Sequence, residues 1–212
     1  VFNEESTLDK LLNELKQFSK NNQICIVNDG STDSSKKILS NCNFIKYIEL
    51  DKNYGKGKAV LEGILNSSFN KLILIDGDLE LNTKEIENFM NLGSDPQVDF
   101  MLGTRYGKLK PFESVWTLGN YLLTKLFNTV HGCNISDALC CMKSFYKNDI
   151  ELAKIKSTGF DIDVEITSQL IRTKKKFKSV PVKYQRRNLS QGKKIRFTDG
   201  FKILKRIISI SY

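Results

Sequence analysis

Two aspartates separated by one glycine, Asp76 and Asp78, follow an apolar run in this 212-residue chain. The run LILI at 72–75 has the composition of a buried strand, so both carboxylates fall where the chain leaves the core. Adjacent carboxylates raise each other's pKa, and a divalent cation relieves that cost. Oxygen ligands suit Mg²⁺ or Mn²⁺, which phosphates and water usually complete. The pattern DGD fits a metal site for a diphosphate, which Gly77 would let approach the backbone, although Asp-Gly is also a common turn dipeptide.

Short apolar runs alternate with amphipathic stretches around this motif. Strands are expected at 23–27, 44–50, 71–76 and 98–103, and helices at 6–20, within 53–67 after a glycine-rich loop, and at 83–91. The alternation predicts an α/β fold with a Rossmann-like, mostly parallel central sheet flanked by helices. Ligands of such sheets bind outside the carboxyl ends of the strands. The turns NDGSTD, DGD and GTRY fall at those ends, so Asp76 and Asp78 should face one crevice.

The second half of the chain is less regular. Helices are expected at 114–129 and 163–173, a buried strand at 138–146, and an edge strand at 177–187, since Pro181 cannot donate to a ladder. The stretch 199–212 is typical of a basic amphipathic helix. Its apolar residues Phe201, Leu204, Ile207 and Ile208 share a face. Two interpretations of this helix stay open: it lies in a membrane interface, or it packs on the domain.

The charge and the cysteine content limit which cellular compartments and which classes of partner fit the sequence. The formal net charge is +9, which favours an anionic partner, although lysine-rich chains are often simply soluble. The five cysteines are odd in number and form no CxxC pair, so a reduced, cytosolic setting fits best. The cluster His131, Cys133, Cys140 and Cys141 matches no common zinc spacing, and buried small residues are the better interpretation.

No sequence signal for membrane crossing or secretion is present. No apolar run approaches the roughly 18–20 residues that span a bilayer, and no signal peptide is recognisable. The chain starts at Val1 in what reads as the end of a strand, so we expect a piece of a longer protein.

Five motifs, in the order VFNEES, VNDGSTD, NYGKGKAVLEGI, LILIDGDLE and LGTRY, resemble one enzyme family. It comprises the inverting, metal-dependent nucleotide-sugar glycosyltransferases with the GT-A fold. Its polyprenyl-phosphate branch, which includes the dolichyl-phosphate mannose and glucose synthases, is the most similar. The resemblance implies one domain over 1–212: a nucleotide-sugar half at about 1–105, an acceptor half at about 106–198, and the helix 199–212.

The resemblance also implies roles for single residues. Asp76 and Asp78 would hold the metal, and Asp78, Arg105 and Asp137 would be catalytic. The nucleotide-sugar residues would be Phe2, Asn3, Glu4, Asp29, Ser31, Lys56, Asp76 and Gly77. The acceptor phosphate would be held by Arg105, Arg187, Lys194 and Arg196. The GKKIRF segment departs from the family pattern, because Lys194 stands where many relatives carry a serine followed by lysine.

The implied reaction moves a hexose from a UDP- or GDP-linked donor to a membrane polyprenyl phosphate. A phosphate monoester is largely dianionic at pH 7 and needs no strong base, so positioning and charge stabilisation dominate. With a saccharide or other hydroxyl acceptor, Asp137 becomes the candidate general base. The expected partners are the nucleotide sugar, polyprenyl phosphate and an anionic membrane surface, with the protein cytoplasmic and peripheral on the membrane's cytoplasmic face.

Other interpretations are weaker. NYGKGKA is not a P-loop, because it lacks GxxxxGK[ST] and places Ala59 at the hydroxyl position. Lys174–Lys176 are typical of a solvated face, and Glu165 is a further acid within possible reach of the site. A nucleic-acid-binding module has no recognised motif here, and a nucleotidyltransferase would need a glycine-rich start that is missing.

Overall fold

The computed structural model describes residues 1–105, 114–187, 192, 194–195 and 197–210. Its strands are β1 (Ile24–Asn28), β2 (Ile45–Glu49), β3 (Lys71–Leu74), β4 (Phe100–Thr104), β5 (Lys143–Tyr146) and β6 (Phe177–Pro181). Its α-helices are α1 (Glu5–Lys16), α2 (Ser35–Ser40), α3 (Lys56–Asn66), α4 (Ile86–Met90), α5 (Val115–His131), α6 (Ile162–Arg172) and α7 (Phe197–Ser209). Short 3₁₀ turns cover Thr83–Glu85, Lys147–Asp149 and Leu152–Lys154. The predicted α/β class is confirmed.

The strands form two sheets that share one direction except for β5. Strands β1 and β2 pair in parallel, and a second sheet has the order β3-β5-β4-β6. Strand β5 runs antiparallel to β3 and β4, whereas β6 pairs in parallel with β4. Pro181 ends β6 at the edge of this sheet, as its missing N–H predicts. The mostly parallel sheet expected from the sequence is thus present, with β5 as its antiparallel member.

The predicted strand at 138–146 begins only at Lys143. The backbone N–H of Ala138 donates to the hydroxyl of Thr124 on α5, and that of Leu139 donates to the Asp137 carboxylate. Side chains therefore take the donors that a ladder would need, and the segment before β5 stays irregular.

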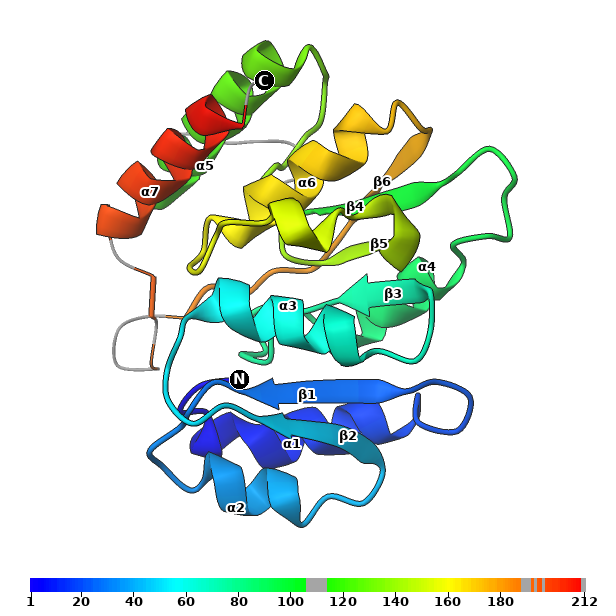
Figure 1. Cartoon of the computed structure of the whole chain (residues 1–212), viewed down its shortest axis with the longest axis vertical. Coiled ribbons are helices and arrows are strands. Elements are labelled where there is room, and N and C mark those ends of the chain that lie inside the picture. Colours follow the sequence, from blue (N-terminus) through cyan, green and yellow to red (C-terminus); the bar gives the residue numbers. More distant parts are fainter. Residues whose placement is uncertain (106–113, 188–191, 193, 196, 211–212) are drawn as a thin grey trace.

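Strands β1 and β3 lie next to each other in Figure 1 without pairing. A cavity of about 1130 Å³ extends along them and is lined by consecutive residues of both strands. Val1 connects their carboxyl ends: its α-amino group donates to the Val27 carbonyl (2.7 Å), and its carbonyl accepts from the Asp29 N–H (2.9 Å). A Cβ on Gly77 would lie 2.5 Å from Val1 Cγ1, so close packing here requires glycine at position 77.

Two apolar clusters hold the layers together. Helix α1 buries Leu8, Leu11, Leu12 and Leu15 against the β1 side of the molecule. The other cluster joins α5, α6 and α7 to the faces of β4 and β5 through Phe100, Phe127, Phe145, Ile162 and Ile207. Figure 1 shows α7 beside α5 at the far side from β1 and β2.

Helix α7 packs on the domain through Ile203 and Ile207, of which only Ile207 belongs to the apolar face predicted from the sequence. Ile203 and Ile207 are buried, whereas Phe201 is 74% and Ile208 54% exposed. Six of the 13 residues of this helix are apolar and lie along one side of it, and the edge of that side with Ile203 and Ile207 faces the core. Among the helices that the structure describes, none is both long and apolar enough to cross a membrane.

The isoleucine pair in α7 gives a matched test of this packing. Ile207→Ala should lower the free energy of unfolding by about 2–4 kcal/mol, because it opens a cavity in the core. Ile208→Ala, one position along, should change it by less than about 1 kcal/mol. Urea unfolding of both variants measures the difference, and equal losses would contradict the orientation of α7.

Candidate functional site

The candidate site lies where β3 and β4 end. Asp76, Asp78 and Glu80 line one small pocket with Arg105, Leu81, Leu139, Cys141 and Tyr184. Asp76 follows the last residues of β3, and Arg105 follows β4 directly. The predicted convergence of DGD and GTRY at one edge of the sheet is therefore confirmed for these side chains.

Lys56, the first residue of α3, joins this cluster through Asp76. Its ammonium lies 2.8 Å from Asp76 Oδ2 and 2.7 Å from Asp163 Oδ2. Burial alone would lower the pKa of Lys56, but Asp163 and Asp76 outweigh it and raise the pKa well above its ordinary value. Burial would raise the pKa of Asp76, and Lys56 reverses that so that the pKa falls. Lys56 and Asp76 are therefore both charged at neutral pH.

Asp78 has much less compensation. Burial, followed by the neighbouring Asp76 charge, raises the pKa of Asp78 to about 6. The Glu80 backbone N–H donates to Asp78 Oδ1 at 3.0 Å. A carboxyl group whose pKa is raised by a neighbouring carboxylate is a favourable place for a cation to bind.

The donor set fits Mg²⁺ or Mn²⁺ held jointly with a ligand. Within the described residues there is no cluster of three or more His, Cys, Asp or Glu side chains arranged to hold a metal by themselves. Two carboxylates with phosphate oxygens and water are the usual composition of a magnesium site in phosphate-binding enzymes. The zinc interpretation of His131 and its neighbouring cysteines finds no support in this part of the chain, and all five cysteines are free thiols.

Arg105 and Asp137 form a bidentate pair. Arg105 Nε donates to Asp137 Oδ2 at 2.8 Å, and Nη2 donates to Oδ1 at 2.9 Å. Asp137 is 5% exposed, and the Arg105 guanidinium carbon lies 5.4 Å from the Tyr184 ring centroid. Both carboxylate oxygens of Asp137 are thus engaged in orienting Arg105 toward the pocket.

The NDGSTD turn is organised by its own side chains and by Asn3. The Asn3 N–H donates to Ser31 Oγ (2.9 Å), and Asn3 Oδ1 accepts from the Thr32 N–H (2.8 Å). Asp29 accepts from the backbone N–H groups of Tyr54 (2.8 Å) and Gly55 (2.9 Å). Asp29, predicted to bind the base, therefore also anchors the glycine-rich loop that leads to Lys56.

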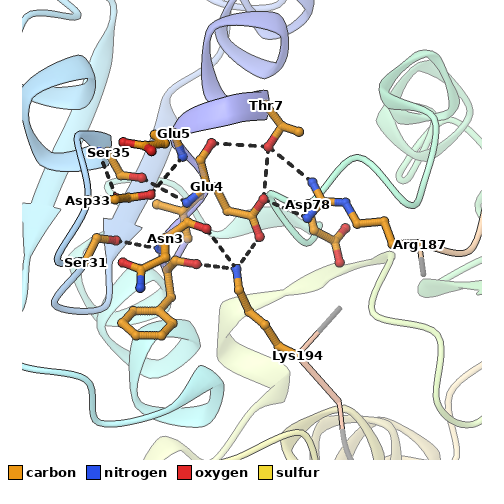
Figure 2. A network of polar contacts seen from close by, with 12 residues as sticks. Asn3, Glu4, Glu5, Thr7, Ser31, Asp33, Ser35, Asp78, Arg187 and Lys194 are labelled. Atoms are coloured by element: carbon orange, nitrogen blue, oxygen red, sulfur yellow. Dashed lines mark hydrogen bonds and ion pairs between the residues drawn. The ribbon is translucent and has the colours of Figure 1, made fainter. Parts of the chain in front are cut away.

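Glu4 is the centre of a second charged network, shown in Figure 2. Its carboxylate is 4% exposed and lies 2.8 Å from Arg187 Nη1, and Lys194 forms an ion pair with its other oxygen. Thr7 donates to the same carboxylate at 2.9 Å and accepts from Arg187. Arg187 and Lys194, predicted to bind the acceptor phosphate, thus pair with Glu4, which was predicted to bind the nucleotide sugar. The residues predicted for the two ligands are therefore in direct contact here.

The remaining predicted residues divide into three groups. Phe2 and Gly77 line the large cavity next to this site. Arg196 lies outside the described residues. Glu165 accepts from the backbone N–H groups of Lys156 and Ser157, so it holds the loop before α6 rather than a ligand.

Three charged residues of the site were not predicted. Glu80 lines the pocket with the two aspartates, and its place two residues after Asp78 is a signal that could have found it. Asp163 on α6 contacts Lys56, and Lys143 on β5 pairs with the other oxygen of Asp163. Nothing in the local sequence around either residue indicates that contact.

The α/β architecture is that of the GT-A fold. Glucosyl-3-phosphoglycerate synthase from Mycobacterium tuberculosis, crystallised with Mn²⁺, UDP and phosphoglyceric acid, matches with a TM-score of 0.72. The match covers 100% of this chain and 76% of that chain at 15% sequence identity, so it shows the fold alone. The family model described as glycosyl transferase family 2 matches residues 1–152. The chain belongs to glycosyl transferase family 2.

Curated relatives add names from archaea, bacteria and a protist. Sequence identity is 26% over 211 residues to the low-salt glycan biosynthesis hexosyltransferase Agl6 of Haloferax volcanii, covering 95% of this chain and 50% of that protein. It is 24% over 162 residues to an undecaprenyl-phosphate 4-deoxy-4-formamido-L-arabinose transferase of Proteus mirabilis, covering 71% and 48%. It is 26% over 239 residues to the dolichyl-phosphate beta-glucosyltransferase ALG5A of Trichomonas vaginalis, covering 100% and 71%. The chain therefore spans about half the length of the first two relatives.

The crowded carboxylates predict a variant that is more stable than the natural chain. Asp78→Asn should raise the free energy of unfolding by about 1–2 kcal/mol near pH 7.5 without divalent cations. The folded-state pKa of about 6 exceeds the ordinary value of 3.8. Ionisation of Asp78 therefore costs the folded state stability, a cost that grows between these two pH values and is fully present above about pH 6. Below about pH 3 the group is largely protonated in both states and the gain should vanish.

Urea unfolding at both pH values measures this effect. Asp9→Asn, at an exposed position of α1, is the matched control and should change stability little at either pH. Loss of stability in Asp78→Asn near pH 7.5 would contradict the described electrostatics.

Proposed function

We propose that this chain transfers a hexose from a UDP- or GDP-linked donor to a polyprenyl phosphate, with inversion at the sugar. The observation that carries the proposal is the Arg105–Asp137 pair next to Asp76 and Asp78. It presents a fixed cation beside the carboxylates, which suits an acceptor that is itself a phosphate. The names of the dolichyl-phosphate and undecaprenyl-phosphate relatives support the same acceptor class.

The carboxylates and Lys56 would organise the donor. Mg²⁺ or Mn²⁺ bound by Asp76 and Asp78 would supply Lewis-acid stabilisation of the departing nucleoside diphosphate. Lys56 lies against Asp76 and adds a fixed positive charge on the same side. Asn3, Glu4, Asp29 and Ser31 shape the loops that border this space. The charged groups that would bind the diphosphate are thus in place before the sugar is transferred.

The acceptor side needs orientation more than proton transfer. Arg105 would bind the acceptor phosphate and reduce its repulsion from the donor, while Asp137 keeps the guanidinium in place. Arg187 and Lys194 lie close by on Glu4 and would add to the binding of an anion. Because the phosphate dianion attacks without losing a proton, Asp137 has no proton to accept. With a hydroxyl acceptor, Asp137 would have to leave Arg105 to act as base.

Asp137→Asn separates the two acceptor classes. We expect it to lower turnover only about tenfold and to raise the KM for polyprenyl phosphate, because Arg105 loses its orienting partner. Removal of a general base would instead cost about 10²–10⁴-fold in kcat. The assay supplies Mn²⁺, labelled UDP- and GDP-hexoses and a short-chain polyprenyl phosphate, and measures label in the organic phase.

Asp149→Asn is the matched control, since Asp149 pairs with Lys175 away from the site, and it should leave transfer unchanged. A loss in Asp137→Asn of more than about 10³-fold in kcat with an unchanged KM would favour the base and a hydroxyl acceptor. Label transferred from every donor to a saccharide and none to lipid would overturn the proposed acceptor.

We further infer a membrane-facing surface formed by α5 and α7, which lie side by side in Figure 1. Large apolar side chains are exposed on both helices, namely Val115, Leu122, Phe197, Phe201 and Ile208. The exposed lysines of the same helices are Lys125, Lys202 and Lys205. Apolar side chains mixed with lysines fit an anionic bilayer surface, where a polyprenyl phosphate resides.

Vesicle flotation tests this surface. The chain should bind vesicles containing phosphatidylglycerol and bind phosphatidylcholine vesicles weakly, and Phe201→Ser should reduce binding about tenfold or more. Phe69→Ser removes a phenylalanine of 55% exposure in the turn before β3 and should leave binding unchanged. Equal losses of vesicle binding in both variants, or equal binding to anionic and neutral vesicles, would contradict the proposed membrane-facing surface.

A further inference from the structure

A row of alternating charges runs from the metal-site carboxylates into the core. Lys56 Nζ is shared between Asp76 Oδ2 at 2.8 Å and Asp163 Oδ2 at 2.7 Å. On its other side, Asp163 Oδ1 lies 3.6 Å from Lys143 Nζ. The side chains come from four separate parts of the fold: the end of β3, α3, α6 and β5.

The inner half of this row is buried. Lys143 is 1% and Asp163 5% exposed, and Lys143 also donates to the Cys140 carbonyl. Asp163 Oδ1 has no hydrogen-bond partner in the described part of the chain, so its contact with Lys143 is an ion pair without a short hydrogen bond. Charges buried this deeply destabilise a core unless they are paired, and retaining them is consistent with a functional use.

We propose that Asp163, backed by Lys143, is a positioning residue that shares the Lys56 ammonium with Asp76, weakens the Lys56–Asp76 ion pair and so keeps Asp76 available to a divalent cation. This inference rests on the proposed metal site at Asp76 and Asp78. It assigns a use to two residues outside that site, and it explains why one ammonium lies between two carboxylates.

The effect follows from competition for Asp76. Lys56 and a divalent cation are both attracted to the same carboxylate, and each weakens the other's binding there. Asp163 offsets part of the Lys56 charge and holds the ammonium at a fixed place. Without the Asp163 carboxylate, Lys56 pairs with Asp76 as its remaining carboxylate partner among the described residues, and the cation must displace a stronger ion pair.

Titration of the protein with Mn²⁺ alone, followed by the loss of the free-ion electron paramagnetic resonance signal, tests this. Asp163→Asn should weaken Mn²⁺ binding about tenfold. Asp161→Asn is the matched control, because Asp161 is also a buried aspartate next to α6 but pairs with Arg206 at 2.9 Å. The control should bind Mn²⁺ like the natural chain.

Thermal unfolding of both variants separates positioning from general damage. Similar losses of stability, with weakened Mn²⁺ binding only in Asp163→Asn, would support the inference. Unchanged Mn²⁺ binding in Asp163→Asn, or equal weakening in both variants, would overturn it. Failure of the natural chain to bind Mn²⁺ at all would instead overturn the metal site, so the two failures are distinguishable.

Discussion

The structure depends on two carboxylates, Asp76 and Asp78, that the fold holds together with too little positive charge to neutralise both. Lys56 neutralises Asp76, whereas burial and the Asp76 charge leave Asp78 with a pKa of about 6. The repulsion persists in the folded state because strand β3 and the close contact of Gly77 with Val1 fix the turn that carries both carboxylates. Such stored repulsion is relieved by a cation, and it links the stability of the domain to ligand binding.

The surrounding elements each supply one cation at a defined place. Helix α3 begins with Lys56, and its loop is anchored by Asp29. Arg105 follows strand β4 directly, and Asp137 fixes it in a bidentate pair. Glu4 holds both Arg187 and Lys194. Each of these cations therefore has a carboxylate partner that fixes its place, so binding an anion at the site would cost little side-chain entropy.

Local patterns in the sequence predicted the parts of the fold that local physics controls. The apolar run before DGD, the turns at strand ends and the edge position of Pro181 follow from residue type and spacing, and all three appear in the structure. The direction of β5 was not predictable, because side-chain alternation does not encode strand direction. The contact of Asp163 with Lys56 joins residues 107 positions apart, and the buried face of α7 depends on tertiary packing; neither leaves a local signal.

Calorimetry of nucleoside diphosphate binding is the most direct test of the central claim. UDP and GDP are titrated into the natural chain with Mn²⁺ and, separately, with a chelator. The account predicts that at least one of the two binds with Mn²⁺, and that the chelator, or replacement of both Asp76 and Asp78 by alanine, weakens it by about 100-fold or more. Equal affinity with and without the cation would contradict the claim that these carboxylates hold a diphosphate through a metal.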